Sequence, residues 1–198
     1  MTNIILFGKM GSGKDTVAEY LTAKVWPPMR PQRLGKYIRK HVCEMYPKLE
    51  EDKRRTYYQA YGEGLRTIFG PDHWNEITNQ GVLQFSHGGN YPSDILIVDA
   101  RQEHELAYWT AKGFIPFAVD MKEDKRKLRL QRRDGDKFNE EAFMHSTEEA
   151  AGRIIESIKS GETKGYVIDN NGILEETYQQ IDDILQTIRA EALLVTNS

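Results

Sequence analysis

A glycine-rich segment close to the N-terminus places the strongest constraint on the fold of this chain. Residues 8–14 read GKMGSGK, and they follow the continuous apolar run IILF. Such a run is typical of a strand buried on both faces, and apolar residues at helical spacing begin after residue 14. Glycines allow successive backbone N–H groups to turn inward, and the start of a helix adds partial positive charge. The pattern therefore predicts a strand, a phosphate-binding loop and a helix.

The spacing of this segment matches G-x-x-x-x-G-K, in which the lysine reaches the β- and γ-phosphates of a nucleoside triphosphate. The next position commonly carries a hydroxyl that binds Mg²⁺, but here it is Asp15. A carboxylate is also a good Mg²⁺ ligand, so we expect Asp15 to hold the ion directly or through water. Thr16 is expected to contact an α-phosphate or to cap the helix. ATP and Mg²⁺ are thus the expected cofactors. The expected nucleotide-binding residues of this segment are Gly8, Met10, Gly11, Ser12, Gly13, Lys14, Asp15 and Thr16.

Three further apolar runs, at residues 95–98, 114–119 and 166–168, alternate with segments of helical character. This alternation predicts an α/β fold, a three-layer α/β/α sandwich with a mostly parallel sheet. Pro116 lies inside one of the runs, which favours an edge strand or an irregular one. An amphipathic helix is expected from Leu174 onward.

Two long segments have no strand signal. Residues 29–92 are mainly helical in pattern, with a loop expected over residues 79–92 because of their glycines and proline. Residues 134–152 are polar and are expected to form a mobile segment.

Composition excludes several classes of protein. Charged residues make up 29% of the chain and the net charge is −3, which argues against binding a nucleic acid polymer through bulk charge. No apolar run approaches the roughly 18 residues that a membrane span needs, and the N-terminus lacks the pattern of a secretion signal. One cysteine, Cys43, allows no internal disulfide. We expect a cytoplasmic protein, away from membranes, that is a monomer or a homodimer.

A second group of polar residues follows the strand at residues 95–98. Asp99 is expected to organise Mg²⁺ or to accept a proton from the acceptor, and Arg101 to bind an acceptor phosphate through its two-pronged guanidinium. The alternative is a salt-bridged pair that closes the strand. Ala100 stands where a mechanochemical ATPase usually has a catalytic glutamate, and Met121 stands where a GTPase motif requires Asn or Thr. The residues therefore favour a kinase.

Seven basic residues gather between Lys122 and Arg133. Arg129 and Arg133 are four positions apart, so they share one face of a helix. Arginines on a closing segment can clamp a phosphoryl group and exclude water, which predicts a catalytic role for this pair. The alternative is a solvated basic helix.

Several motifs resemble those of two related kinase families in the correct order. The loop GSGKDT, the segment DARQEHE at residues 99–105, the segment at 59–66 with Gln, Gly and Arg, and HSTE at residues 145–148 are similar to motifs of phage-type deoxynucleoside monophosphate kinases. The aspartate after the loop lysine is shared with animal phosphomevalonate kinases. The strand, turn and helix at residues 166–185 resemble the closing elements of both.

The resemblance implies a single domain of the nucleoside-monophosphate-kinase type, with a P-loop core, a helical acceptor-binding insertion and a lid. The core would comprise residues 1–28, 93–121 and 163–192, the insertion residues 29–92, and the lid residues 122–152. Lys14 would bind the donor, and one lid arginine, Arg129 or Arg133, would stack on adenine. The acceptor would be bound by Gln59, Arg66 and Arg101, the metal by Asp15 and Asp99, and the base by the backbone of Asn171.

The expected activity is transfer of the γ-phosphoryl group from ATP to a phosphorylated small molecule, a (deoxy)nucleoside monophosphate. A phosphomevalonate-kinase-like enzyme and a non-catalytic nucleotide sensor are the alternatives. Residues 33–36 read RLGK where the deoxynucleotide kinases have Asp-Pro-Leu-Lys, which leaves the acceptor base open. His145 and Glu148 are either site residues or a helix cap.

Overall fold

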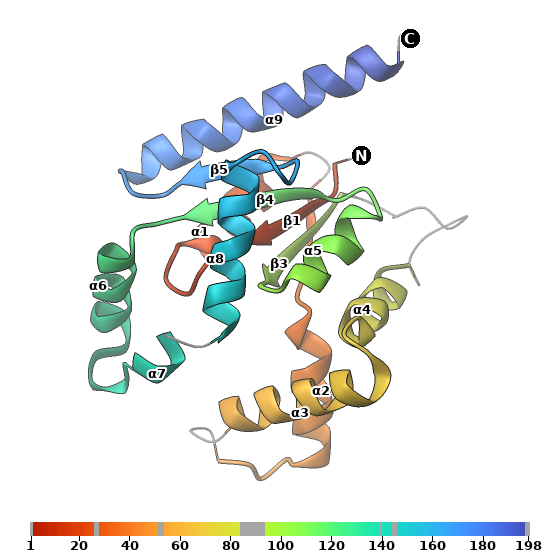
Figure 1. The fold of residues 1–198 in the computed structure, drawn as a ribbon, viewed down its shortest axis with the longest axis vertical. Coiled ribbons are helices and arrows are strands. Elements are labelled where there is room, and N and C mark those ends of the chain that lie inside the picture. The colour runs from red at the N-terminus through yellow and green to blue at the C-terminus, as the bar shows by residue number, and fades with distance from the viewer. Residues whose placement is uncertain are drawn as a thin grey trace.

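The computed structural model of the chain describes residues 2–25, 28–50, 54–83, 94–138, 140–143 and 146–196. Its centre is a five-stranded sheet with the order β2-β3-β1-β4-β5, in which every paired neighbour is parallel (Figure 1). The strands are β1 (Ile4–Phe7), β2 (Arg30–Gln32), β3 (Ile95–Ala100), β4 (Ile115–Asp120) and β5 (Tyr166–Asp169).

Helices cover both faces of the sheet, as the three-layer prediction requires. Successive residues of β1 point to opposite faces, so Ile4 and Leu6 join one core cluster while Ile5 and Phe7 join the other. The first cluster is completed by α1 (Lys14–Lys24) and α9 (Leu174–Thr196), and the second by α5 (Glu103–Thr110) and α8 (Ser146–Lys159). The centre of the sheet is therefore buried on both faces, which explains the uninterrupted apolar runs of β1 and β3.

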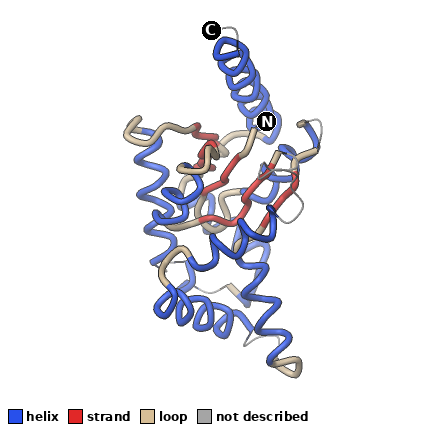
Figure 2. Tube along the Cα trace, turned by 90° about the vertical axis from the view of Figure 1, so that its right-hand side faces the viewer, coloured by secondary structure: helices blue, strands red, loops and turns tan. Residues whose placement is uncertain are grey.

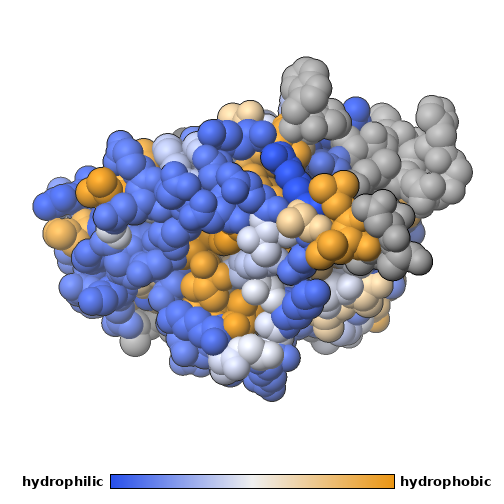
Figure 3. Space-filling view, turned by 90° about the horizontal axis from the view of Figure 1, so that it is seen from above, coloured by the Kyte–Doolittle hydropathy of each residue, from blue (hydrophilic) through white to orange (hydrophobic). Residues whose placement is uncertain are grey.

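The end of α9 extends beyond the rest of the molecule (Figure 2). Its last turns carry the exposed side chains of Leu193 and Leu194. The face seen from above is otherwise mainly hydrophilic, with hydrophobic side chains in small groups (Figure 3). Among the helices that the structure describes, none is both long and apolar enough to span a bilayer.

The insertion between β2 and β3 forms a separate group of helices at one end of the molecule (Figure 1). It contains α2 (Gly35–Met45), α3 (Arg54–Phe69) and α4 (His73–Leu83). Trp74 is buried in this group, and its indole N–H donates to the carbonyl of Gly62 at 3.0 Å, which ties α4 to α3. Trp74 thus packs the helices of the insertion together.

The prediction of a loop over residues 79–92 is wrong for its first residues, because α4 continues to Leu83. Gly81 lies inside this helix, where an added Cβ would come within 1.9 Å of the Tyr37 hydroxyl. The glycine is needed for close approach of a ring, and it does not mark a turn. Residues 84–92 of the expected loop lie outside the described part of the chain.

The expectation of an edge or irregular strand at Pro116 is also wrong. β4 lies between β1 and β5 in the sheet. Ile115 donates its N–H to Asn3 on the β1 side, so the next residue faces β5, and the β5 pairing begins only at Phe117. A proline is tolerated there because no ladder hydrogen bond is lost.

Elements in two segments were missed in the sequence. The short strand β2 carries a proline and no apolar run, and its backbone pairing with β3 is what defines it. The supposedly mobile segment 134–152 contains a 3₁₀ turn at Gly135–Lys137, α7 (Glu140–Phe143) and the first half of α8. Ala151, Ile154, Ile155 and Ile158 repeat at helical spacing and are buried. That repeat was a visible signal for α8.

Candidate active site

The loop between β1 and α1 has the backbone that its glycines predicted. Gly11 and Gly13 have φ angles of 79° and 93°, which side chains rarely allow. A Cβ on Gly13 would come within 2.2 Å of the amide nitrogen of Asn170. That amide donates to the carbonyl of Ser12 at 2.7 Å, so the turn after β5 holds the loop from behind.

Lys14 is the first residue of α1, and its side chain is buried against the loop that precedes it. Its ammonium donates to the carbonyl of Gly8, and it lies 3.4 Å from that of Lys9. Burial, together with the positive charge of Arg101, lowers the pKa of Lys14 to about 7 against the opposing effect of Glu148. A bound polyphosphate would supply the negative charge that this ammonium lacks.

The loop lines a cavity of about 320 Å³. All the expected nucleotide-binding residues from Met10 to Thr16 border it, while Gly8 contributes only its carbonyl to Lys14. Arg129 and Arg133 of α6 (Glu123–Asp134) border the same cavity, as their shared helix face predicted. We call this space the loop cavity.

A second cavity of about 260 Å³ lies between the insertion and β3. Its walls include Gln59 and Arg66 of α3, which the resemblance assigned to the acceptor, together with Arg39 of α2. The Nε atom of Arg66 is buried without a partner among the described residues. We call this space the insertion cavity. Asp99 and Arg101 border both cavities, so the two spaces meet at the end of β3.

Asp99 lies within β3 and not beyond it, because the strand continues to Ala100. Its two carboxylate oxygens accept the backbone N–H groups of Leu34 at 2.7 Å and Gly35 at 3.2 Å. The carboxylate therefore anchors the start of α2 to the sheet. The alternative of a salt-bridged Asp99–Arg101 pair is not what forms, since Arg101 pairs with Glu148.

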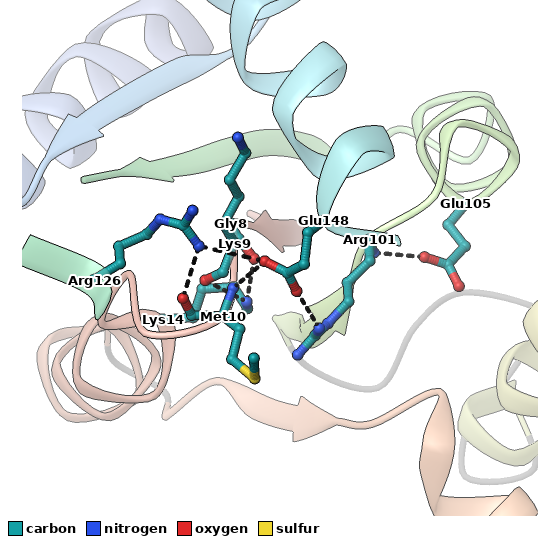
Figure 4. A network of polar contacts seen from close by, with 8 residues as sticks. All are labelled: Gly8, Lys9, Met10, Lys14, Arg101, Glu105, Arg126 and Glu148. Carbon is teal, nitrogen blue, oxygen red and sulfur yellow. Dashed lines mark hydrogen bonds and ion pairs between the residues drawn. The ribbon is translucent and has the colours of Figure 1, made fainter. Parts of the chain in front are cut away.

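Glu148 is the residue whose role the sequence left open, and Figure 4 shows it at the centre of a polar network. One carboxylate oxygen accepts the N–H of Met10 at 2.6 Å, and the other accepts an N–H of Arg101 at 2.7 Å. Arg126 of α6 lies 3.5 Å from the first oxygen and donates to the carbonyl of Met10 at 3.0 Å. Glu148 therefore braces the loop. His145 lies outside the described residues.

Glu105 completes this network on the other side of Arg101. Its carboxylate accepts the backbone N–H groups of Arg101 and Gln102, and the residue is buried at the wall of the insertion cavity. Burial raises the pKa of Glu105 to about 7, against the lowering effect of these two hydrogen bonds. The only sequence signal for this residue was its place in the DARQEHE segment.

Asp15 and Asp99, the two expected metal ligands, both border the loop cavity. Asp15 is exposed and pairs with Arg33 of the insertion at 3.0 Å. Mg²⁺ in kinases is typically held by one or two carboxylates, phosphate oxygens and water. An ion held here would need phosphate oxygens or water beside these two carboxylates, since the described residues contain no cluster of three or more acidic, histidine or cysteine ligands.

The contacts of Asn171 lie between the turn after β5 and the start of α6. Its side-chain oxygen accepts the backbone N–H of Lys122 at 2.9 Å, and its carbonyl accepts from the side chain of Lys125. It therefore joins the turn after β5 to the start of α6, and its neighbour Asn170 is the residue that contacts the loop. An approach of Asn171 to a nucleotide base stays a prediction.

The parallel sheet with helices on both faces, and the loop after β1, define a P-loop protein with a three-layer α/β/α fold. Solved structures with the same fold include TT1252 from Thermus thermophilus, with a TM-score of 0.57 and 17% identity over 94% of this chain and 98% of that one. A gluconokinase from Sinorhizobium meliloti has a TM-score of 0.53 and 14% identity over 96% and 97% of the two chains. At such identities the likeness is one of fold. No protein-family model and no curated protein matches the sequence.

Proposed function

We propose that this chain is an ATP-dependent kinase that transfers the γ-phosphoryl group to a phosphorylated small molecule of the (deoxy)nucleoside monophosphate class. The observation that carries the proposal is the meeting of two cavities at Asp99 and Arg101. One cavity is bordered by a phosphate-binding loop and the other by the insertion. A donor in the first and an acceptor in the second would face each other across these two side chains.

The donor side would work by positioning and by neutralising charge, with little covalent chemistry from the protein. Lys14 would contact the β- and γ-phosphates, and the backbone N–H groups of residues 11–14 would surround them. Mg²⁺ carried by the triphosphate would be held near Asp15 and Asp99, and it would supply additional positive charge. Arg129 and Arg133 border the same cavity and would neutralise charge on the transferring group from the side of α6.

The acceptor side supports a phosphorylated molecule because of its arginines. Arg39, Arg66 and Arg101 border a cavity of about 260 Å³. Guanidinium groups match a phosphate with paired N–H donors, and several together favour a multiply charged anion over a neutral sugar. Gln59 and Tyr58 border the same cavity and offer polar contacts for the rest of the acceptor.

The division into a core, an insertion (residues 29–92, of which β2 pairs with the core sheet) and a lid (residues 122–152) forms part of the proposal. The lid must close over the donor to keep water from taking the phosphoryl group. Its helix α6 already faces the loop through Arg126, which supports a lid hinged close to the donor.

Coupled assays of ADP formation would test this proposal. The panel comprises ATP with each deoxy- and ribonucleoside monophosphate, phosphomevalonate and gluconate. We expect acceptor-dependent ADP with at least one nucleoside monophosphate, and its loss in Arg101→Ala. ADP formation with gluconate alone would exclude a phosphorylated acceptor. ATP binding in calorimetry that is unaltered by Arg101→Ala, without turnover of any compound, would instead indicate a nucleotide sensor.

A further inference from the structure

One buried carboxylate contacts segments from both sides of the proposed site. Glu148, on α8, is bonded to Met10 of the loop at 2.6 Å and to Arg101 after β3 at 2.7 Å (Figure 4). Its side chain is 5% exposed. Glu148 is not among the described residues that border the loop cavity or the insertion cavity. It is therefore not placed to touch a ligand in either cavity.

The charged groups around Glu148 carry a net positive charge, which favours binding of an anion. Its carboxylate faces two guanidinium groups, Arg101 and the buried Arg126. A guanidinium has five N–H groups, so the bond from Arg101 to Glu148 leaves donors for an anion at the junction of the cavities. The carboxylate fixes the orientation of the Arg101 guanidinium and leaves some of its N–H donors available. A partly exposed, long side chain would otherwise sample many rotamers.

The loop side is held just as firmly. Glu148 accepts the N–H of Met10 while its partner Arg126 donates to the carbonyl of the same residue. Both polar groups of one loop residue are thus engaged by an ion pair between α8 and α6. This arrangement fixes the rim of the loop before a nucleotide binds, which lowers the ordering cost of binding.

We propose that Glu148 is a positioning residue that sets the donor loop through Met10 and the acceptor phosphate through Arg101. The inference rests on the proposed function for the identity of the two sites. It adds that the geometry of both depends on one side chain that touches neither ligand. A change confined to this carboxylate should consequently weaken binding in both cavities.

The test is Glu148→Gln, with Glu149→Gln as the matched control. Met10 and Arg101 donate to different oxygens of the carboxylate, and in glutamine one of those two positions is an NH2 group, which donates and does not accept. Glu149 is the exposed neighbour on α8, so the same chemical change there leaves the network intact. Binding of AMP-PNP with Mg²⁺ is measured by calorimetry, followed by inorganic phosphate added to protein already saturated with AMP-PNP. We expect about tenfold weaker phosphate binding and about threefold or more weaker AMP-PNP binding in Glu148→Gln alone.

A double-mutant cycle with Arg101→Gln separates positioning from a general loss of structure. In that background Glu148→Gln should change phosphate affinity less than about twofold, because the arginine that it orients toward the anion is already absent. Its effect on the affinity for AMP-PNP should persist. Additive losses of phosphate affinity, or unaltered binding of both ligands in Glu148→Gln, would overturn the proposal.

Glu148→Asp covers the case in which the glutamine variant fails to fold. It keeps the charge beside Arg126 but is one methylene shorter, so it cannot reach both Met10 and Arg101. We expect a folded protein with the same loss of affinity for one or both ligands. Parental affinity for both ligands would contradict the inference. All of these measurements are of binding, so a failure to find any phosphoryl acceptor would count against the proposed function and leave this test intact.

Discussion

Arg101 and Glu148 form an ion pair of 2.7 Å in which the glutamate is 5% exposed and the arginine 32% exposed. The pair joins the loop after β3 to the start of α8, two segments 47 positions apart in the chain. Its buried end braces the loop through Met10, and its exposed end borders both cavities. The pair thereby links the structural support of the site to its ligand-facing surface.

Substitution of Lys14 should remove the proposed activity without unfolding the protein. Lys14→Ala deletes the ammonium that lies in the loop, and the loss of a charge-assisted phosphate contact costs about a thousandfold or more in rate. Removing a desolvated ammonium from a buried position should leave thermal stability equal or higher. Steady-state kinetics with the best acceptor of the panel, together with thermal unfolding, would measure both effects.

Lys24→Ala provides the matched control for that experiment. Lys24 is in the last turn of the same helix and pairs with Asp182 on the surface, so its removal should leave the rate close to that of the parent. Activity of Lys14→Ala within tenfold of the parent would contradict the assignment of the loop.

Nucleotide binding should take up a proton at pH 8. The pKa of Lys14 is about 7 in the free protein, so the side chain is mostly neutral at that pH. Triphosphate oxygens favour the charged form and raise this pKa, so binding AMP-PNP should draw in about one proton. Calorimetry in buffers of different ionisation enthalpy measures the number. Lys14→Arg, which stays charged throughout, should take up close to none, and equal uptake in the two proteins would rule out Lys14 as the source.

Glu105 should make stability depend on pH. Its pKa is raised from an ordinary value of 4.5 to about 7, so the folded protein holds this proton more tightly than the unfolded chain. The contribution is complete below pH 4.5 and is lost as the pH rises through 7. The shift corresponds to roughly 3 kcal/mol in the free energy of unfolding.

Glu105→Gln isolates that contribution, because glutamine is uncharged and its oxygen still accepts from the backbone of residues 101 and 102. Denaturant unfolding of both proteins between pH 4.5 and pH 8 provides the comparison. We expect the parent to lose stability relative to the variant as the pH rises. Parallel curves would show that Glu105 titrates normally in the folded protein.

Arg66 should affect the acceptor and leave the donor unchanged. It borders the insertion cavity and not the loop cavity, so Arg66→Ala should raise the acceptor KM about tenfold or more with little change in the KM for ATP. Arg189→Ala, an exposed arginine on α9, serves as the control for loss of positive charge. A change in the KM for ATP alone would reverse the assignment of the two cavities.

The sequence was sufficient for the parts of the fold that have local signals. The loop, its flanking strand and helix, and the alternation of apolar runs with helices predicted the three-layer sheet. The strand β2 could not be found in the same way, because its pairing with β3 depends on a partner about 65 residues further along the chain.

The residues of the candidate site divide in the same way, into those with a local sequence signal and those whose role depends on a distant partner. Arg129 and Arg133 were predicted from helix spacing, and they border the loop cavity. The role of Glu148 depends on a contact with Met10 across 138 positions, and no local pattern encodes such a distance. Likewise, Asn170 and Asn171 are adjacent in the sequence, and only the turn after β5 decides which one contacts the loop.

A crystal structure with AMP-PNP and Mg²⁺ would test the central claim most directly. The account predicts the β-phosphate within hydrogen-bonding distance of the backbone N–H groups of residues 11–14, with the Lys14 ammonium turned from the carbonyl of Gly8 toward phosphate oxygens. A triphosphate bound elsewhere, or a loop whose N–H groups face away from it, would contradict the account.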